Sequence, residues 1–144
     1  AGDDGDFDAL CQQLHRYQAT LRTCFTLENF DNLIKNGRMR PIVGTLLRSL
    51  GIHIIADATA EGTIHVADKA RGVGKTYRAI TALMKASKDC TDAEVVISHC
   101  ENLEGAMALK RQILADLPVK QVDLLSCRGL TSFYAMEKGL IVGY

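Results

Sequence analysis

The chain has 144 residues, 47% of them hydrophobic and 24% charged, which is the composition of one globular domain rather than of a disordered chain. Its 17 basic and 17 acidic residues cancel, which argues against a nucleic-acid binder and against a protein held on anionic membranes. No apolar run approaches the ~20 residues that a membrane-spanning helix needs.

The cysteines and the N-terminal residues indicate in which cellular compartment the protein is expected. The five cysteines are scattered without a CxxC pair, which predicts neither a zinc site nor a disulfide framework and fits a reducing cytoplasm. Residues 1–6 are too acidic for a secretory or mitochondrial leader. We expect them to be a cloning remnant or the cut end of a longer chain.

The first third of the chain predicts a helix, a strand and a short second helix. Asp6 is suited to cap a helix over residues 7–19, and the alternating residues 21–27 predict a strand. A short helix over residues 28–35 is expected to stop at Asn36-Gly37, a strong C-terminal signal.

The rest of the chain alternates helices and strands. Pro41 suits the first turn of a helix that ends at Gly51, and β-branched runs over 52–56 and 63–67 predict a hairpin-like pair. This alternation predicts an α/β fold with a mixed, partly parallel sheet, helices packed on it, and an antiparallel edge. The remaining predicted elements are helices over 74–87, 103–117 (capped by Asn102) and 132–138, strands over 93–98 and 122–127, and an apolar tail at 140–142.

A glycine-rich turn at residues 72–76, Gly-Val-Gly-Lys-Thr, ends like a phosphate-binding loop. That loop needs four residues between its first glycine and Gly-Lys-Thr, whereas only Val73 separates Gly72 from this motif. Two interpretations remain, a solvated turn or a basic patch of Lys69, Arg71 and Lys75 that contacts an anion or an acidic partner.

Histidine and serine patterns name no catalytic group and no metal site. The four histidines form neither HxH nor HExxH, although His53 and His65 fall on facing strands and are candidate neighbours. Ser98 and His99 are adjacent on a predicted strand, so their side chains point to opposite faces. These observations favour a binding protein over an enzyme.

The segment Asn36-Gly37-Arg38-Met39 places an arginine between two apolar helix stripes. The purely structural interpretation is that the helix ends here and that the arginine after it is solvated. Alternatively, an arginine beside an apolar groove is suited to bind an amphipathic carboxylate. The flanking stripes are Leu33 and Ile34 on one side and Ile42, Val43, Leu46 and Leu47 on the other.

The order of these motifs resembles that of the DegV family. Residues 29–39, Asn-Phe-Asp-Asn-Leu-Ile-Lys-Asn-Gly-Arg-Met, are similar to its "LxxLxxGGRI" segment, and Lys69-Ala70-Arg71 with Lys75 resembles its "K-x-R" helix start. Residues 95–99, with the helix start that follows them, resemble its "hADn" strand and loop. The likeness extends over about residues 7–144 and rests on order and spacing.

The resemblance implies a two-domain bacterial fatty-acid carrier of which residues 1–144 are the C-terminal domain. In that family the N-terminal domain completes the site, and the protein presents its fatty acid to a fatty acid kinase without being a catalyst. The ligand is then a long-chain fatty acid, and no cofactor, nucleic acid or stable membrane insertion is expected. Carried over by position, the residues are Arg38, Gly37 and Tyr134 for the head group, Met39, Ile42, Val43 and Leu46 for the acyl groove, and Lys69, Arg71 and Lys75 for the partner surface.

Two departures from the family pattern leave a second interpretation open. The family's "THTGPG" stretch, whose histidine joins the head-group network, is replaced by residues 132–139, and Tyr134 stands near the position of the histidine. The family's "IKPIL" is changed at residues 52–56. The alternative is a divergent protein-interaction or regulatory domain that no longer binds lipid, with an enzyme or nucleotide binder as a third hypothesis.

Overall fold

The structure is a computed structural model and describes residues 6–39, 51–59 and 62–144. Within these residues the strands are β1 (Thr23–Leu27), β2 (Ile52–Ala58), β3 (Ile64–Arg71), β4 (Glu94–His99), β5 (Gln121–Ser126) and β6 (Leu140–Gly143). They form one sheet in the order β3-β2-β1-β6-β4-β5, in which β4 and β5 are parallel and the other neighbours antiparallel. The predicted mixed, partly parallel α/β sheet with an antiparallel β2–β3 edge is confirmed.

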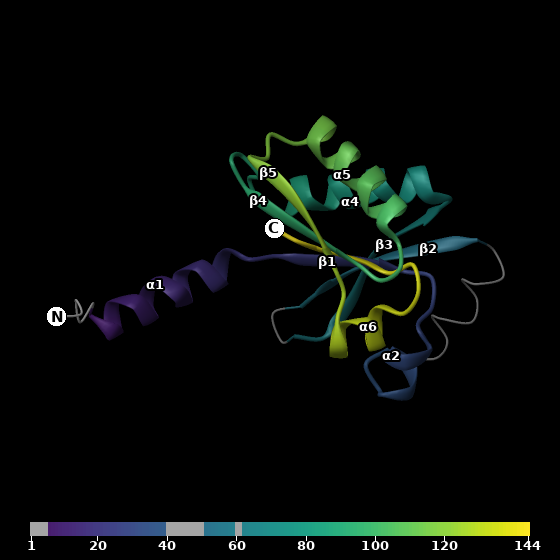
Figure 1. Cartoon of the computed structure of the whole chain (residues 1–144), viewed down its shortest axis with the longest axis horizontal. Coiled ribbons are helices and arrows are strands. Elements are labelled where there is room, and N and C mark those ends of the chain that lie inside the picture. Colours follow the sequence, from purple (N-terminus) through teal and green to yellow (C-terminus); the bar gives the residue numbers. More distant parts are fainter. Residues whose placement is uncertain (1–5, 40–50, 60–61) are drawn as a thin grey trace.

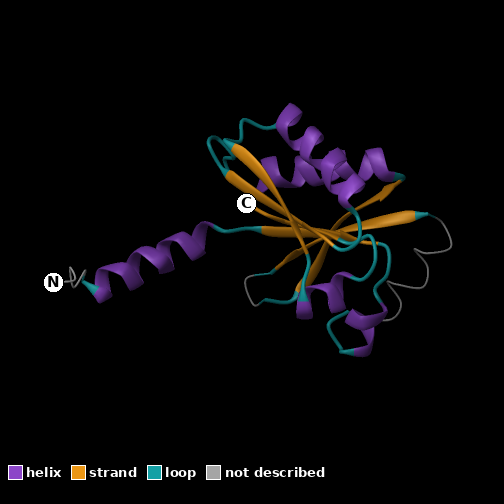
Figure 2. Ribbon diagram, in the orientation of Figure 1, coloured by secondary structure: helices purple, strands orange, loops and turns teal. Residues whose placement is uncertain are grey.

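Helices cover both faces of this sheet. Figures 1 and 2 show α4 (Val73–Ser87) and α5 (Leu103–Asp116) together on one face, and α2 (Asp31–Lys35) and α6 (Gly129–Ala135) on the other. The predicted helix after Pro41, with Ile42, Val43 and Leu46, lies outside the described residues.

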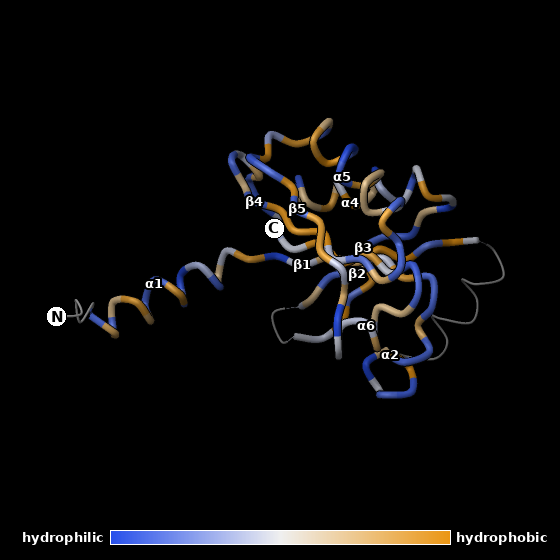
Figure 3. The backbone as a smooth tube through the Cα atoms, viewed as in Figure 1, coloured by the Kyte–Doolittle hydropathy of each residue, from blue (hydrophilic) through white to orange (hydrophobic). Residues whose placement is uncertain are grey.

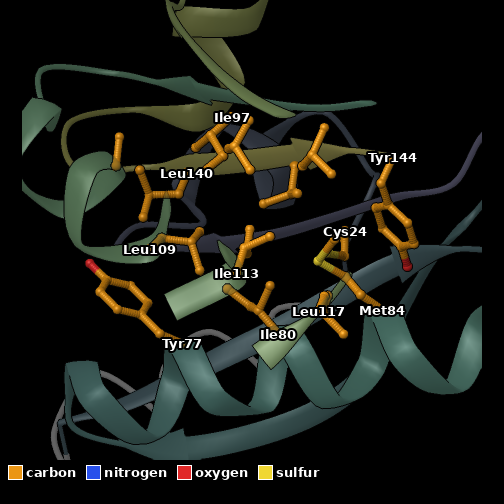
Figure 4. Packing of buried hydrophobic residues seen from close by; sticks show 14 of the residues in the cluster. Cys24, Tyr77, Ile80, Met84, Ile97, Leu109, Ile113, Leu117, Leu140 and Tyr144 are labelled. Atoms are coloured by element: carbon orange, nitrogen blue, oxygen red, sulfur yellow. The ribbon is translucent and has the colours of Figure 1, made fainter. Parts of the chain in front are cut away.

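The main core lies between the sheet and the pair α4 and α5. Ile80 and Met84 of α4 and Leu109 and Ile113 of α5 are fully buried against Ile97 of β4 (Figure 4). The two residues named in each helix are four positions apart, so one stripe of each helix faces the sheet. A second, smaller cluster on the opposite face includes buried residues of β1, β2, α2 and α6.

The first helix, α1 (Phe7–Thr20), extends away from the sheet (Figure 1). As predicted, the Asp6 carboxylate caps it by accepting a hydrogen bond from the N–H of Asp8 at 3.1 Å. No residue of α1 is buried, and its apolar positions are the hydrophobic segments along this helix in Figure 3. The apolar stripe comprises Phe7, Leu10, Leu14 and Tyr17, whose exposed fractions range from 74% at Phe7 to 52% at Leu14. Contiguous exposed apolar surface of this kind is typical of an interaction site.

Three predictions were wrong. The helix expected over 28–35 begins only at Asp31, as α2, because the chain before it forms a turn in which the Asn29 Oδ1 accepts a hydrogen bond from the N–H of Asp31 at 2.8 Å. The helix expected over 132–138 begins and ends three residues earlier, as α6, because Met136 and Lys138 adopt left-handed φ angles of +53° and +64° that a helix cannot contain. His53 and His65 are not neighbours, because the β2–β3 register pairs His53 with Ala70. His65 instead lies opposite Asp57, and its Nδ1 is 2.9 Å from the Asp57 Oδ1.

Candidate functional site

Helix α2 ends in a left-handed turn at Gly37, as the sequence predicts. Gly37 has a φ of +68°, and its N–H donates to the carbonyl oxygen of Ile34 at 3.0 Å. The N–H of Arg38 donates to the carbonyl oxygen of Leu33 at 2.8 Å, which completes the paired C-cap arrangement. These bonds tie the backbone of Gly37 and Arg38 to α2, so the turn fixes where the arginine leaves the helix.

The Arg38 side chain lies over the ring of Tyr134 in α6. The Arg38 Cζ atom is 5.5 Å from the ring centroid, within the distance at which a guanidinium is attracted to an aromatic face. The two helices are joined by a hydrogen bond of 2.6 Å from the Asn32 Nδ2 to the carbonyl oxygen of Phe133. The Phe133 ring meets the Tyr134 ring edge-on at 5.1 Å and restricts it further. The three residues expected in a head-group network thus lie together, and their role stays a prediction.

The chemistry of this pair suits a carboxylate. No acidic side chain among the described residues forms an ion pair with Arg38. A guanidinium stacked on a ring keeps its forked N–H donors at the edge, where they match the two oxygens of a carboxylate or of a phosphate. The Tyr134 hydroxyl is a further donor nearby.

Only the beginning of the expected acyl groove falls within the described residues. The N–H of Met39 donates to the carbonyl oxygen of Leu33 at 3.2 Å, and its half-buried side chain packs against the smaller cluster. The buried members of that cluster are Leu27, Phe30, Leu33, Ile54, Ala56 and Ala135. An apolar surface therefore adjoins the Arg38–Tyr134 pair.

The three basic residues of the expected partner surface lie on other elements. Lys69 and Arg71 end β3, Lys75 lies in the first turn of α4, and all three are exposed. No phosphate-wrapping loop separates them, because Gly72, with a φ of +83°, leads directly into α4 at Val73. Their contact with a partner stays a prediction.

His99, next to Ser98 in β4, serves the fold in the described structure. His99 is buried, and its Nδ1 lies 3.4 Å from the N–H of Asn102. The Asn102 side chain caps α5, as predicted, by accepting from the N–H of Gly105 at 3.2 Å. Among residues 6–39, 51–59 and 62–144 no group of three histidine, cysteine, aspartate or glutamate side chains is suited to hold a metal ion.

The structure also contains a pocket, which we call the α4/α5 pocket and which the sequence analysis missed. Its volume is about 310 Å³, and it is lined by the first turns of α4 and α5, the end of β1, and the starts of β2 and β6. Thr26, Tyr77 and Glu104 are among its lining residues. Because its residues come from five separated elements, no local pattern could have indicated it.

These features define a small α/β domain in which an arginine stacked on a tyrosine ring adjoins an apolar cluster on one face of the sheet. No helix of the described part is long and apolar enough to cross a membrane. The chain belongs to the DegV family: the family described as "Uncharacterised protein, DegV family" matches residues 1–140.

Relatives and solved structures agree with this assignment. A DegV domain-containing protein of Streptococcus gordonii is 32% identical over 139 residues, which are 96% of this chain and 49% of that protein. The Streptococcus pneumoniae fatty acid kinase (Fak) B3 protein, solved with linoleic acid, superimposes with a TM-score of 0.86 at 32% identity over 96% of this chain and 49% of its own. A DegV family protein of Ruminococcus gnavus, solved with vaccenic acid, superimposes with a TM-score of 0.87 at 29% identity. The match covers 98% of this chain and 50% of that protein. This chain therefore spans about half the length of the curated relatives it matches.

Proposed function

We propose that this chain supplies one side of a fatty-acid-binding site. Arg38 and Tyr134 hold the carboxylate head group, and the Gly37 turn sets the direction of the arginine. The observation that carries the proposal is the guanidinium 5.5 Å from the Tyr134 ring with no described acidic partner. The bound linoleic and vaccenic acids of two similar proteins support a carboxylate as the ligand group.

The acyl chain of this ligand runs along the apolar surface that begins at Met39. Residues Ile42, Val43 and Leu46 continue the groove in this proposal. The neighbouring buried cluster of β1, β2, α2 and α6 supports it, because an acyl chain gains free energy in proportion to the apolar area it removes from water.

The site is completed by a second domain. In this proposal the chain is the C-terminal domain of a two-domain, cytoplasmic carrier, and an N-terminal domain closes over the fatty acid. Two observations support a second domain. The apolar stripe of α1 is exposed, as a surface that contacts another domain would be, and the chain matches only 49% of the length of a relative. The carrier presents its fatty acid to a fatty acid kinase for acyl-phosphate formation, with Lys69, Arg71 and Lys75 facing the kinase, and is not itself the catalyst.

The test is the fatty acid that the two-domain protein retains after purification from bacteria. Extraction and mass spectrometry of the wild type should give long-chain fatty acid close to one per protein. Arg38→Ala should retain about tenfold less, since a charge-assisted hydrogen bond contributes about 1.5 to 3 kcal/mol. The matched control is Arg111→Ala, which removes an exposed arginine of α5 that has no partner within residues 6–39, 51–59 and 62–144, and it should retain the wild-type amount.

Two outcomes would contradict the proposal. A wild-type protein without any acyl chain would refute the carrier and favour a protein-interaction domain of the same fold. Equal retention by Arg38→Ala and Arg111→Ala would remove Arg38 from the head-group site.

A further inference from the structure

Cys100 and Cys127 directly follow the parallel strands β4 and β5. The register of the two strands pairs His99 with Ser126 at their ends, and the N–H of Cys127 donates to the carbonyl oxygen of His99 at 2.8 Å. This bond continues the parallel pattern, so the two cysteines occupy the next pair of positions. Neighbouring strands lie about 4.8 Å apart, and the Cα atoms of disulfide-bonded residues are about 4.4 to 6.8 Å apart. The backbone therefore places these cysteines at a separation that a disulfide can span.

Both cysteine side chains lie on the same face of the sheet. Val95 and Val122, which are paired in the same register, both belong to the main core. Cys100 and Cys127 each lie five positions further along, so they point to the opposite face, where both pack half-buried against the smaller cluster. Burial, and then the charge of Cys100, raise the pKa of Cys127. The effect of that charge requires the two sulfur atoms to lie close together.

The other three cysteines are placed differently. Cys24 and Cys90 belong to the main core and are only 0% and 4% exposed, so a dissolved reagent does not reach them in the folded chain. Cys11 lies on α1, which extends away from the sheet (Figure 1). All five cysteines are reduced in this structure. A reagent that enters from solvent therefore finds two neighbouring thiols only at Cys100 and Cys127 among the described residues.

We propose that Cys100 and Cys127 are a redox-active pair that a low-molecular-weight disulfide oxidises reversibly to an intramolecular disulfide. The Cys100 thiolate attacks one sulfur of the reagent, forms a mixed disulfide and releases one thiolate. The Cys127 thiolate then attacks the Cys100 sulfur and releases the second thiolate. Two electrons pass to the reagent, and its two released thiolates take up the two cysteine protons. Cys127 reacts second because its raised pKa keeps it protonated, and the mixed disulfide removes the charge of Cys100 that contributes to that rise.

The bond connects the end of β4 to the start of α6, the helix that carries Tyr134. This helix begins at Gly129, two residues after Cys127, and Figure 1 shows β5 leading into it. The bond also closes a loop that contains α5 and β5, which restricts the unfolded chain and stabilises the fold. The thiol pair does not depend on the proposed fatty-acid site.

The test is oxidation of the 144-residue chain by mixtures of glutathione disulfide and glutathione, in buffer and in concentrated urea. Tandem mass spectrometry of tryptic peptides locates the bond, with fragmentation to separate Cys90 from Cys100, which share the peptide 89–110. The Cys100–Cys127 bond should form about tenfold more readily in the folded chain than in urea, because folding favours a disulfide by the factor by which the disulfide stabilises the fold. The oxidised chain should melt at a higher temperature than the reduced one, and dithiothreitol should reverse both changes.

Two variants assign the thiols. Cys127→Ser should accumulate glutathione on Cys100 as a mixed disulfide, because it lacks the second thiol. Cys11→Ser, which removes a thiol of α1, is the matched control and should form the Cys100–Cys127 bond to the wild-type extent. A folded wild type in which these two cysteines stay unlinked, whether or not they carry glutathione, would overturn the proposal. Equal yields of the bond with and without urea would overturn it too.

Discussion

Replacing Gly37 and Gly74 by alanine in turn tests whether the Gly37 turn requires a residue in the left-handed conformation. An alanine Cβ would meet nothing within 4 Å at either position, so crowding contributes to neither variant. The two sites differ in backbone conformation: Gly37 has a φ of +68°, whereas Gly74 lies within α4. Left-handed backbone costs an L-residue about 1 to 2 kcal/mol, so Gly37→Ala should destabilise the fold by about 1 kcal/mol after the smaller loss of unfolded-chain entropy.

The same substitution at Gly74 should stabilise the fold instead of destabilising it. Alanine favours a helix over glycine by about 0.5 to 1 kcal/mol. Thermal unfolding followed by circular dichroism should therefore move the melting temperature down for Gly37→Ala and up for Gly74→Ala, by about 3 °C per kcal/mol for a domain of this size. Shifts of the same sign, or a Gly37→Ala variant as stable as the wild type, would refute the argument that this turn requires a left-handed residue.

Three further predictions concern the core, a thiol and a carboxylate. Ile113→Ala should lower the free energy of unfolding by about 2 to 5 kcal/mol in urea titrations, because the side chain is fully buried; a loss well under 1 kcal/mol would contradict the described packing. Burial raises the pKa of Cys24 to about 12, so at pH 8 dithionitrobenzoate should label Cys24 far more slowly than Cys11, and equal rates would argue against its burial. A hydrogen bond from Thr81 holds the pKa of Asp116 below its ordinary value of 3.8. The associated stabilisation is present above pH 3.8 and is lost as the pH falls through the lower, folded-state pKa. Thr81→Val should raise that pKa in a carboxyl NMR titration, and an unmoved pKa would exclude the bond.

Features determined by near neighbours in sequence could be predicted. The stop at Gly37 and the cap at Asn102 depend on hydrogen bonds that span five residues or fewer, so the residue types at those positions carry the information. The strand pair β2–β3 is similarly local. Its register, however, places His65 opposite Asp57 rather than near His53, because the turn near Gly62 sets which residues face one another.

Features assembled from distant segments could not be derived from local rules. Arg38 and Tyr134 are far apart in sequence, and only the resemblance to the DegV family suggested that they share a site. The α4/α5 pocket becomes visible only when α4 and α5 are placed over β1. The first helix was predicted, but the spacing of its apolar residues does not say whether the rest of the chain covers them, and within the described structure they stay exposed.

The position of β6 has a consequence for biosynthesis. This strand is the last in chain order, yet it lies in the middle of the sheet, between β1 and β4. On a ribosome, the antiparallel half of the sheet and the β4–β5 pair are both made before the strand that joins them. The two halves therefore wait with open edges until residues 140–143 leave the exit tunnel, and exposed edges of this kind are prone to aggregation. A nascent chain stalled before β6 should consequently be a substrate for chaperones.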